Sequence, residues 1–145
     1  MKAWTLDEDG LPVGYLFHED FEMTPRVAAR DLCTRDDFLM IDCRTPEEWE
    51  VCRVDGSLLI PLHELESRLD EIEDALAERG AGEDAPIGVI CHHGNRSVKA
   101  ALLLQRHGFA GAKSIVGGVD LWAMDIQSGM PRYERENGVC RVVGV

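Results

Sequence analysis

The sequence predicts an α/β fold with a central, mostly parallel sheet of about five strands and helices on both of its faces. Short apolar runs alternate along the chain with segments whose apolar residues recur every three or four positions. Such runs are typical of strands buried on both sides, and the periodic segments are typical of helices that cover a sheet. Ligands of these folds bind beyond the carboxyl ends of the strands, so we look for the site there.

The first helix and strand are expected between residues 24 and 41. Thr24 followed by Pro25 is typical of a helix start, with threonine as the cap and proline at the first helical position, and predicts a helix over residues 26–32. The compact apolar run 38–41 predicts a buried strand.

A second helix and strand follow. Thr45 and Glu48 have the spacing of a capping box, so a short helix begins there, with Trp49 as its apolar anchor. The run 57–60 predicts the next strand, which Pro61 closes.

One long apolar stripe follows this strand and predicts a helix that ends near Gly80. Its members recur at steps of three and four and are Leu62, Leu65, Leu69, Ile72 and Leu76. The acidic residues between them form a solvated face.

The second half of the chain repeats the alternation. Residues 86–90 predict a strand, 97–107 a helix with crowded leucines, and 113–116 a further short strand. Gly117 and Gly118 then lead into a final helix that includes residues 119–122.

The length and composition bound the class of protein. The 145 residues suffice for one domain with a single core, which we assign to residues 24–145 with a short C-terminal tail; residues 1–23 are interpreted as an N-terminal extension that forms at most a hairpin. The net charge of −12 repels nucleic-acid phosphates and anionic membrane surfaces. With no signal peptide or membrane-spanning stretch, we expect a cytoplasmic protein without nucleic-acid or membrane partners.

The five cysteines have an odd count and no regular spacing, which is typical of free thiols in a reducing compartment. Cys91, His92 and His93 are consecutive and do not match the paired spacings of a structural zinc site. We therefore expect neither a metal nor a cofactor.

The loop 91–96 lies between a predicted strand and a predicted helix and is the candidate site. Helix N-termini and nearby cations lower the pKa of a cysteine from about 8.5 to roughly 3.5–7.5. Gly94 permits a curl in which successive amides point inward and bind an anion, and Arg96 adds a positive charge. We predict that Cys91 is a nucleophile whose sulfur is reachable from solvent, rather than an inert buried thiol.

Several motifs between about residues 24 and 131 resemble the rhodanese family of sulfurtransferases. The loop Cys91-His92-His93-Gly94-Asn95-Arg96-Ser97 is similar to the family's Cys-x-x-Gly-x-Arg loop followed by serine. The other similar segments are 38–49 with Asp42-Cys43-Arg44, 54–57 with Ile60-Pro61, Gly117-Gly118 with Trp122, and Gly129-Met130-Pro131. Cys52-Arg53 differs from the Gly-His of many relatives.

The resemblance implies a sulfurtransferase that moves a sulfane sulfur from a donor such as thiosulfate to a thiophilic acceptor through a persulfide on Cys91. It assigns the amides of His92, His93, Gly94, Asn95 and Arg96 to substrate binding. Asp42 and Arg44 would order the neighbouring strand end, and Trp122 would belong to the core. The acceptor would be a small thiol or a sulfur-carrier protein.

Some roles stay open at this point. The side chains of His92 and His93 would act as a general acid, tune the thiol or form the rim of the site. Cys43 and Cys52 are interpreted as apolar residues; either would resolve a persulfide only if the fold brings it close to Cys91.

Two other classes of protein remain alternatives. Cysteine-based phosphatases and arsenate reductases have five residues between cysteine and arginine, whereas this loop has four, and a tighter ring suits one sulfur atom better than a phosphoryl group. A non-catalytic rhodanese-like module for binding or redox sensing is the third hypothesis.

Overall fold

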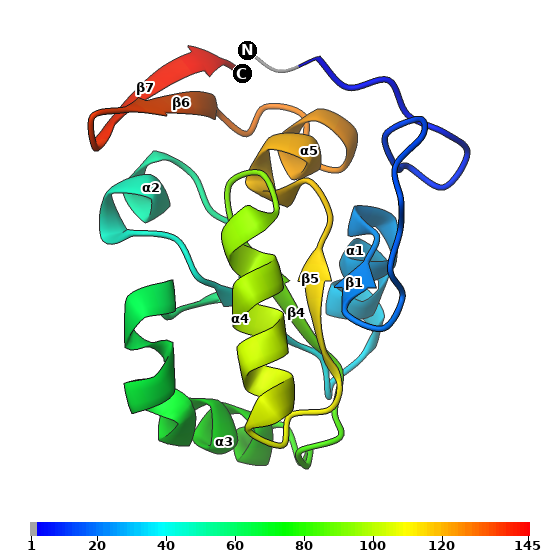
Figure 1. Cartoon of the computed structure of the whole chain (residues 1–145), viewed down its shortest axis with the longest axis vertical. Helices are drawn as coiled ribbons and strands as arrows, with labels where there is room; N and C mark the ends of the chain where they lie inside the picture. The colour runs from blue at the N-terminus through cyan, green and yellow to red at the C-terminus, as the bar shows by residue number, and fades with distance from the viewer. Residues whose placement is uncertain (1–2) are drawn as a thin grey trace.

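The computed structural model describes residues 3–145, so Met1 and Lys2 of the expected N-terminal extension lie outside the described residues. A five-stranded sheet with the order β1-β5-β4-β2-β3 lies at the centre, and all of its pairings are parallel (Figure 1). The strands are β1 (Glu22–Met23), β2 (Leu39–Asp42), β3 (Leu58–Leu59), β4 (Ile87–Ile90) and β5 (Ala112–Ile115). The predicted fold class is confirmed.

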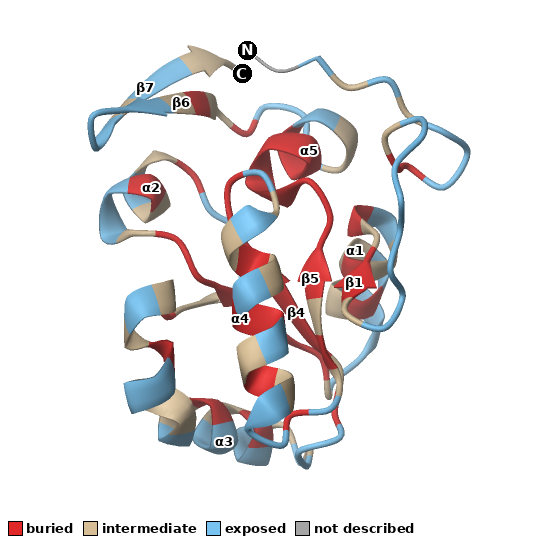
Figure 2. Ribbon diagram, viewed as in Figure 1, coloured by how far each residue is buried: buried red, intermediate tan, exposed pale blue. Residues whose placement is uncertain are grey.

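Helices cover both faces of this sheet and bury the strands between them (Figure 2). One face packs against the 3-10 helix η1 (Leu62–Arg68), α3 (Leu69–Glu78) and α4 (Asn95–Arg106). The other face packs against α1 (Pro25–Thr34) and α5 (Gly118–Asp125). Side chains of a strand alternate between its two faces, so Ile41 joins the first core and Met40 the second.

The predicted helix starts are confirmed at the level of single hydrogen bonds. Thr24 Oγ1 accepts from the Val27 amide at 3.1 Å at the start of α1. Thr45 and Glu48 form the complete capping box of α2 (Pro46–Val51). The buried residue of α2 is nevertheless Glu48, while Trp49 is half-buried and lies under the Arg53 guanidinium.

The long stripe from Leu62 to Leu76 does face the core, but it spans two helices instead of one. A tighter 3-10 turn covers Leu62–Arg68, and the α-helix begins only at Leu69. A spacing of three fits a 3-10 helix as well as an α-helix, which is why the apolar pattern alone did not separate the two.

Both ends of the chain add structure to the sheet domain. Glu22–Met23 pairs with β5 as an edge strand, two residues before the expected domain start at residue 24, and Leu6 forms an antiparallel bridge with Pro12. After residue 131 the chain forms the antiparallel hairpin of β6 (Arg132–Glu136) and β7 (Val139–Gly144) where a tail was expected. No helix within residues 3–145 has the length and apolar character that crossing a membrane requires.

Candidate active site

Cys91 is the first residue after β4, and the loop that follows it leads directly into α4. Gly94 caps this helix with a φ of 105°, in the left-handed region that residues with a Cβ rarely adopt. A Cβ at this position would also lie 3.2 Å from the Gly117 backbone nitrogen. Glycine therefore allows the curl between Cys91 and α4.

The N-terminus of α5 orients the loop from the other side. The Val119 amide donates to the Cys91 carbonyl at 2.8 Å, and the Asp120 amide donates to the His92 carbonyl at 3.2 Å. A Cβ on Gly118 would lie 2.3 Å from the His92 carbonyl oxygen, so only glycine permits this approach. Because the carbonyl and amide of a trans peptide point in opposite directions, the next two loop amides point away from α5.

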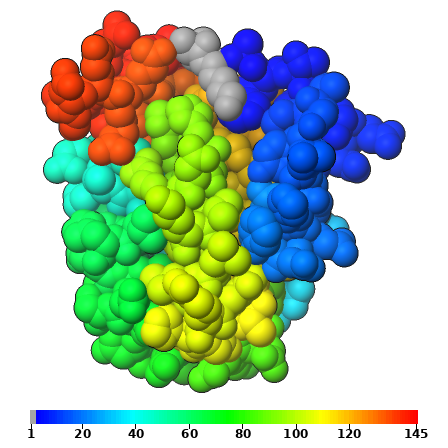
Figure 3. Space-filling model, viewed as in Figure 1, coloured from blue at the N-terminus to red at the C-terminus, as the bar shows by residue number. Residues whose placement is uncertain are grey.

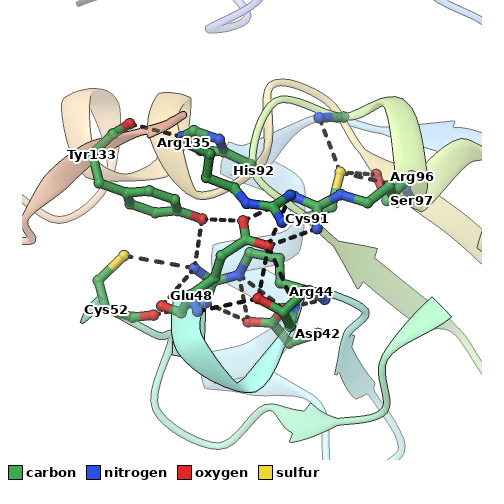
Figure 4. A network of polar contacts seen from close by, with 12 residues as sticks. Asp42, Arg44, Glu48, Cys52, Cys91, His92, Arg96, Ser97, Tyr133 and Arg135 are labelled. Atoms are coloured by element: carbon green, nitrogen blue, oxygen red, sulfur yellow. Dashed lines mark hydrogen bonds and ion pairs between the residues drawn. The ribbon is translucent and has the colours of Figure 1, made fainter. Parts of the chain in front are cut away.

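Three donors of the loop and helix surround the Cys91 sulfur. The amides of Gly94 and Ser97 donate to Sγ at 3.1 and 3.3 Å, and the Ser97 hydroxyl lies 3.2 Å from it. The Ser97 hydroxyl is itself 2.7 Å from that of Ser114 on β5. These contacts hold the sulfur at the start of α4, as Figure 4 shows.

This environment favours the thiolate of Cys91. A hydrogen bond from the Cys43 thiol, then the hydroxyl and amide of Ser97 and the amide of Gly94, together outweigh the opposing effect of burial and lower the pKa of Cys91 to about 5. The same hydrogen bond and burial raise the pKa of Cys43. At neutral pH Cys91 is thus the nucleophile and Cys43 the protonated donor.

The sulfur is less accessible than the sequence predicted. Cys91 exposes only 1% of its surface, so the expectation of a solvent-reachable thiol is wrong for this structure. Two hollows flank the loop: one of about 640 Å³ between His92 and the β6–β7 hairpin, and one of about 470 Å³ between Gly94 and the N-terminal segment. Figure 3 shows the loop end of α4 between that hairpin (orange) and that segment (blue).

Arg96 points away from the sulfur and forms a partly buried ion pair with the fully buried carboxylate of Glu48. Its two terminal nitrogens donate to the two carboxylate oxygens at 2.6 and 2.9 Å. The Tyr133 hydroxyl donates to the same carboxylate at 2.6 Å, and Arg135 lies 3.4 Å from it (Figure 4). Burial raises the pKa of Glu48, but the Arg96 and Tyr133 hydrogen bonds outweigh it and lower the pKa to about 2. Arg96 is therefore fixed between α2 and the loop.

The predicted structural pair after β2 is present. Arg44 is fully buried, and its guanidinium donates to Asp42 at 2.6 Å, to the Cys52 carbonyl at 2.7 Å and to the Tyr133 hydroxyl at 3.0 Å. These bonds tie β2, the end of α2 and β6 together beneath the loop.

The comparisons with known proteins agree with this architecture. Residues 26–125, most of the chain, match the rhodanese-like domain family. The chain belongs to this family. The rhodanese-like domain includes the Cys91 loop, whereas the β6–β7 hairpin lies beyond the matched residues.

Its relatives include both single-domain and larger sulfurtransferases. The thiosulfate sulfurtransferase GlpE of Pseudomonas putida is 30% identical over 103 residues, which cover 71% of this chain and 86% of GlpE. The Arabidopsis thaliana adenylyltransferase and sulfurtransferase MOCS3 is 33% identical over 106 residues, which cover 68% of this chain but only 23% of that protein. The chain thus spans about a quarter of this larger relative. The human single-domain sulfurtransferase TSTD1 superposes with a TM-score of 0.61 at 25% identity, covering 72% of this chain and 96% of TSTD1.

The two histidines of the rhodanese-like loop have different surroundings. The His92 ring stacks on Tyr133 with an interplanar angle of 6°, and its Nε2 lies 3.0 Å from the Tyr133 carbonyl oxygen. Burial, and then the charge of His93, lower the pKa of His92 to about 4, so its ring is neutral at pH 7 and packs against β6. His93 is more exposed and lies 3.8 Å from the Asp120 carboxylate at the rim.

Ligand atoms of His92, His93 and Asp120 lie within 4.8 Å of one another. The Asp120 carboxylate, however, already accepts from the Arg132 guanidinium at 2.9 Å and from the Trp4 indole at 2.8 Å. Ion pairing and hydrogen bonding account for this cluster, and we assign no metal to it.

Four residues that shape the site of this rhodanese-like domain were missed in the sequence. Glu48 was assigned only to the capping box, and Tyr133 to a tail. Ser97 was quoted as part of the motif without a role. Cys43 was interpreted as apolar, although it occupies the same place after β2 as Cys91 after β4, which was the one available signal that the two residues are neighbours across the strands.

Proposed function

We propose that this rhodanese-like sulfurtransferase carries sulfane sulfur as a persulfide on Cys91 and accepts it from thiosulfate or a similar small anion. The observation that carries the proposal is the set of donors around Cys91, which lowers its pKa to about 5. A thiolate is the nucleophilic form of cysteine, and at this pKa it dominates at pH 7.

The reaction would be a double displacement. The Cys91 thiolate attacks the sulfane sulfur of thiosulfate, the sulfur–sulfur bond of the donor breaks, and sulfite leaves. A nucleophilic acceptor then attacks the outer sulfur of the persulfide, and Cys91 leaves as a thiolate. The low pKa favours this second step, because a thiol of lower pKa leaves faster.

The loop would bind the charged outer sulfur in the first intermediate. The candidates are the amides of His92, His93, Gly94, Asn95 and Arg96. The carbonyls of Cys91 and His92 accept hydrogen bonds from α5, so the amides of the same two peptides point away from α5 and toward the site. Backbone donors fixed before the reaction stabilise developing negative charge without reorganisation.

The charged side chains of the hollow between His92 and the β6–β7 hairpin balance one another. Arg135 and Arg141 line it together with Glu134 and Glu136, and Arg141 lies 3.1 Å from Glu134. With a net charge of −12 on the chain, the binding of an anionic donor would therefore rest on the backbone amides of the loop.

The burial of Cys91 restricts what reaches it. With 1% of the residue exposed, transfer requires a local displacement of the loop or its neighbours, and a small donor needs the smallest displacement. A small thiol, or the narrow end of a sulfur-carrier protein, meets the same requirement as an acceptor. We place the reaction in the cytoplasm, where the five free thiols stay reduced.

The test is a parallel assay of the wild type and Cys91→Ser with thiosulfate plus cyanide and with an aryl phosphate. Thiocyanate formation by the wild type alone supports sulfur transfer. Phosphate release without thiocyanate would instead favour the cysteine-based phosphatase or arsenate reductase chemistry. Inactivity of both proteins in both assays would favour a non-catalytic module.

A further inference from the structure

We propose that Cys43 is a resolving thiol: it attacks the Cys91 persulfide, releases the outer sulfur as hydrosulfide and closes a Cys43–Cys91 disulfide. The inference rests on the proposed persulfide on Cys91 and adds a second route for the bound sulfur, alongside direct transfer to an acceptor. The cross-strand placement of the two cysteines carries it.

The strand register sets the two cysteines side by side. β2 and β4 are parallel neighbours in which Ile41 pairs with Val89 and Asp42 with Ile90. The Cys43 amide then donates to the Ile90 carbonyl at 3.0 Å, so the ladder continues to the next pair, Cys43 and Cys91. Neighbouring strands lie about 4.8 Å apart, and a disulfide needs a Cα separation of about 4.4–6.8 Å.

The two side chains also point to the same face of the sheet. Cys43 and Cys91 belong to the core on the α3 and α4 side, whereas Met40 and Ile90 belong to the core on the other face. Asp42 precedes Cys43 and, by the alternation of side chains along a strand, also points to that other face. Each thiol also shifts the pKa of the other, as expected of neighbouring groups. The disulfide therefore requires a change of side-chain angles and no new pairing of strands.

Burial gives Cys43 an advantage over any external thiol. Both residues expose only 1% of their surface, so a solution thiol reaches the inner sulfur of the persulfide only after the loop opens. Cys43 already lies next to that sulfur. Holding two reacting groups in contact replaces a bimolecular encounter by an intramolecular step.

The step balances without an added oxidant. The Cys43 sulfur attacks Sγ of Cys91, the bond between Sγ and the outer sulfur breaks, and the Cys43 proton passes to the leaving sulfur as hydrosulfide. The sulfane sulfur is reduced to sulfide while the two cysteine sulfurs are oxidised to a disulfide. A dithiol reductant then regenerates the two thiols.

Sulfur loading on Cys91 would itself activate Cys43. The hydrogen bond to Cys91, burial and the negative charge of Cys91 raise the pKa of Cys43, whereas Arg96 lowers it. When Sγ carries a second sulfur, the negative charge moves outward to that atom. Two of the causes that keep Cys43 protonated are then weakened, while the Arg96 charge remains.

Cys52 provides a matched control. It is also buried, with 7% of its surface exposed, but it lies in the core on the other face of the sheet and contacts Arg44 at 3.8 Å. It therefore shares the chemistry and burial of Cys43 without the neighbouring position.

The experiment follows one turnover of fully reduced protein without oxygen. Wild type, Cys43→Ser and Cys52→Ser are loaded with thiosulfate or, in a second arm, chemically with inorganic polysulfide; excess reagent is removed, and released sulfide and intact mass are measured. Serine retains a hydroxyl that donates to Cys91, and Cys43→Ala serves as a second variant if the serine protein unfolds.

We expect the wild type and Cys52→Ser to release one equivalent of sulfide and to end as a Cys43–Cys91 disulfide, while Cys43→Ser keeps the added sulfur. Equal sulfide release by Cys43→Ser, or a stable persulfide in the wild type, would overturn the inference and leave the proposed function intact. Failure of thiosulfate but not polysulfide to load Cys91, with the disulfide still formed, would overturn the thiosulfate reaction and support the resolving role.

Discussion

Removing the Ser97 hydroxyl is expected to raise the pKa of Cys91 while the two backbone donors stay in place. This hydroxyl lies 3.2 Å from the sulfur and is one of the groups that lower the pKa to about 5. A hydrogen bond to a charged group contributes about 1.5–3 kcal/mol, and a pKa change of one corresponds to about 1.4 kcal/mol. Ser97→Ala is therefore expected to raise the pKa of Cys91 from about 5 to about 6–7.

The assay is a pH titration of the thiolate absorbance, taken as the difference between each protein and the same protein with Cys91→Ser. Ser114→Ala is the matched control, because it removes the 2.7 Å partner of Ser97 but leaves the hydroxyl next to the sulfur. We expect its titration to stay closer to that of the wild type. An unchanged midpoint in Ser97→Ala, or an equal rise in Ser114→Ala, would refute the assignment of the hydroxyl as a direct donor.

Three further predictions concern the ion pair, the loop and the pH dependence. Glu48→Gln leaves Arg96 without its buried partner and is expected to lower the free energy of unfolding by about 3–5 kcal/mol in denaturant titrations, against less than about 0.5 kcal/mol for the exposed neighbour in Glu47→Gln. Gly94→Ala and Gly14→Ala both place a Cβ at positive φ and are each expected to cost about 1–2 kcal/mol of stability. Only the Cβ of Gly94→Ala meets a neighbouring backbone, and in the Cys43→Ser background, which is expected to retain bound sulfur, only this variant is expected to abolish sulfur loading, measured by mass spectrometry. In the folded protein the pKa of Cys91 is depressed to about 5, so the thiolate contributes to stability. The free energy of unfolding of the wild type minus that of Cys91→Ser is expected to be largest above pH about 8.5 and to fall by about 1.4 kcal/mol per pH unit as the pH is lowered toward 5. Equal losses of stability in Glu48→Gln and Glu47→Gln, equal sulfur loading of Gly94→Ala and Gly14→Ala, or a pH-independent difference between the wild type and Cys91→Ser would count against the corresponding argument.

The fold was predictable because its signals are local in the sequence. Apolar runs marked the central strands, and Thr24 and Thr45 marked helix starts through hydrogen bonds to residues three positions away. The Cys91 loop was predictable for the same reason, since its cysteine, glycine and helix start lie within a few residues.

The surroundings of the loop were not predictable, because they depend on contacts between distant segments. Glu48 satisfies a local capping rule and also pairs with Arg96, 48 positions away. Tyr133 reaches the same carboxylate from a hairpin 85 positions further along the chain. The Cys43–Cys91 neighbourhood follows from the pairing of β2 with β4, which a single apolar run does not reveal.

The most direct test of the account is peptide mass spectrometry of the Cys43→Ser protein after exposure to thiosulfate, since this variant is expected to retain the bound sulfur. The account predicts one added sulfur atom on the peptide that contains Cys91 and none on those with Cys33, Cys52 or Cys140. An unmodified Cys91, or sulfur bound equally to the other cysteines, would contradict it.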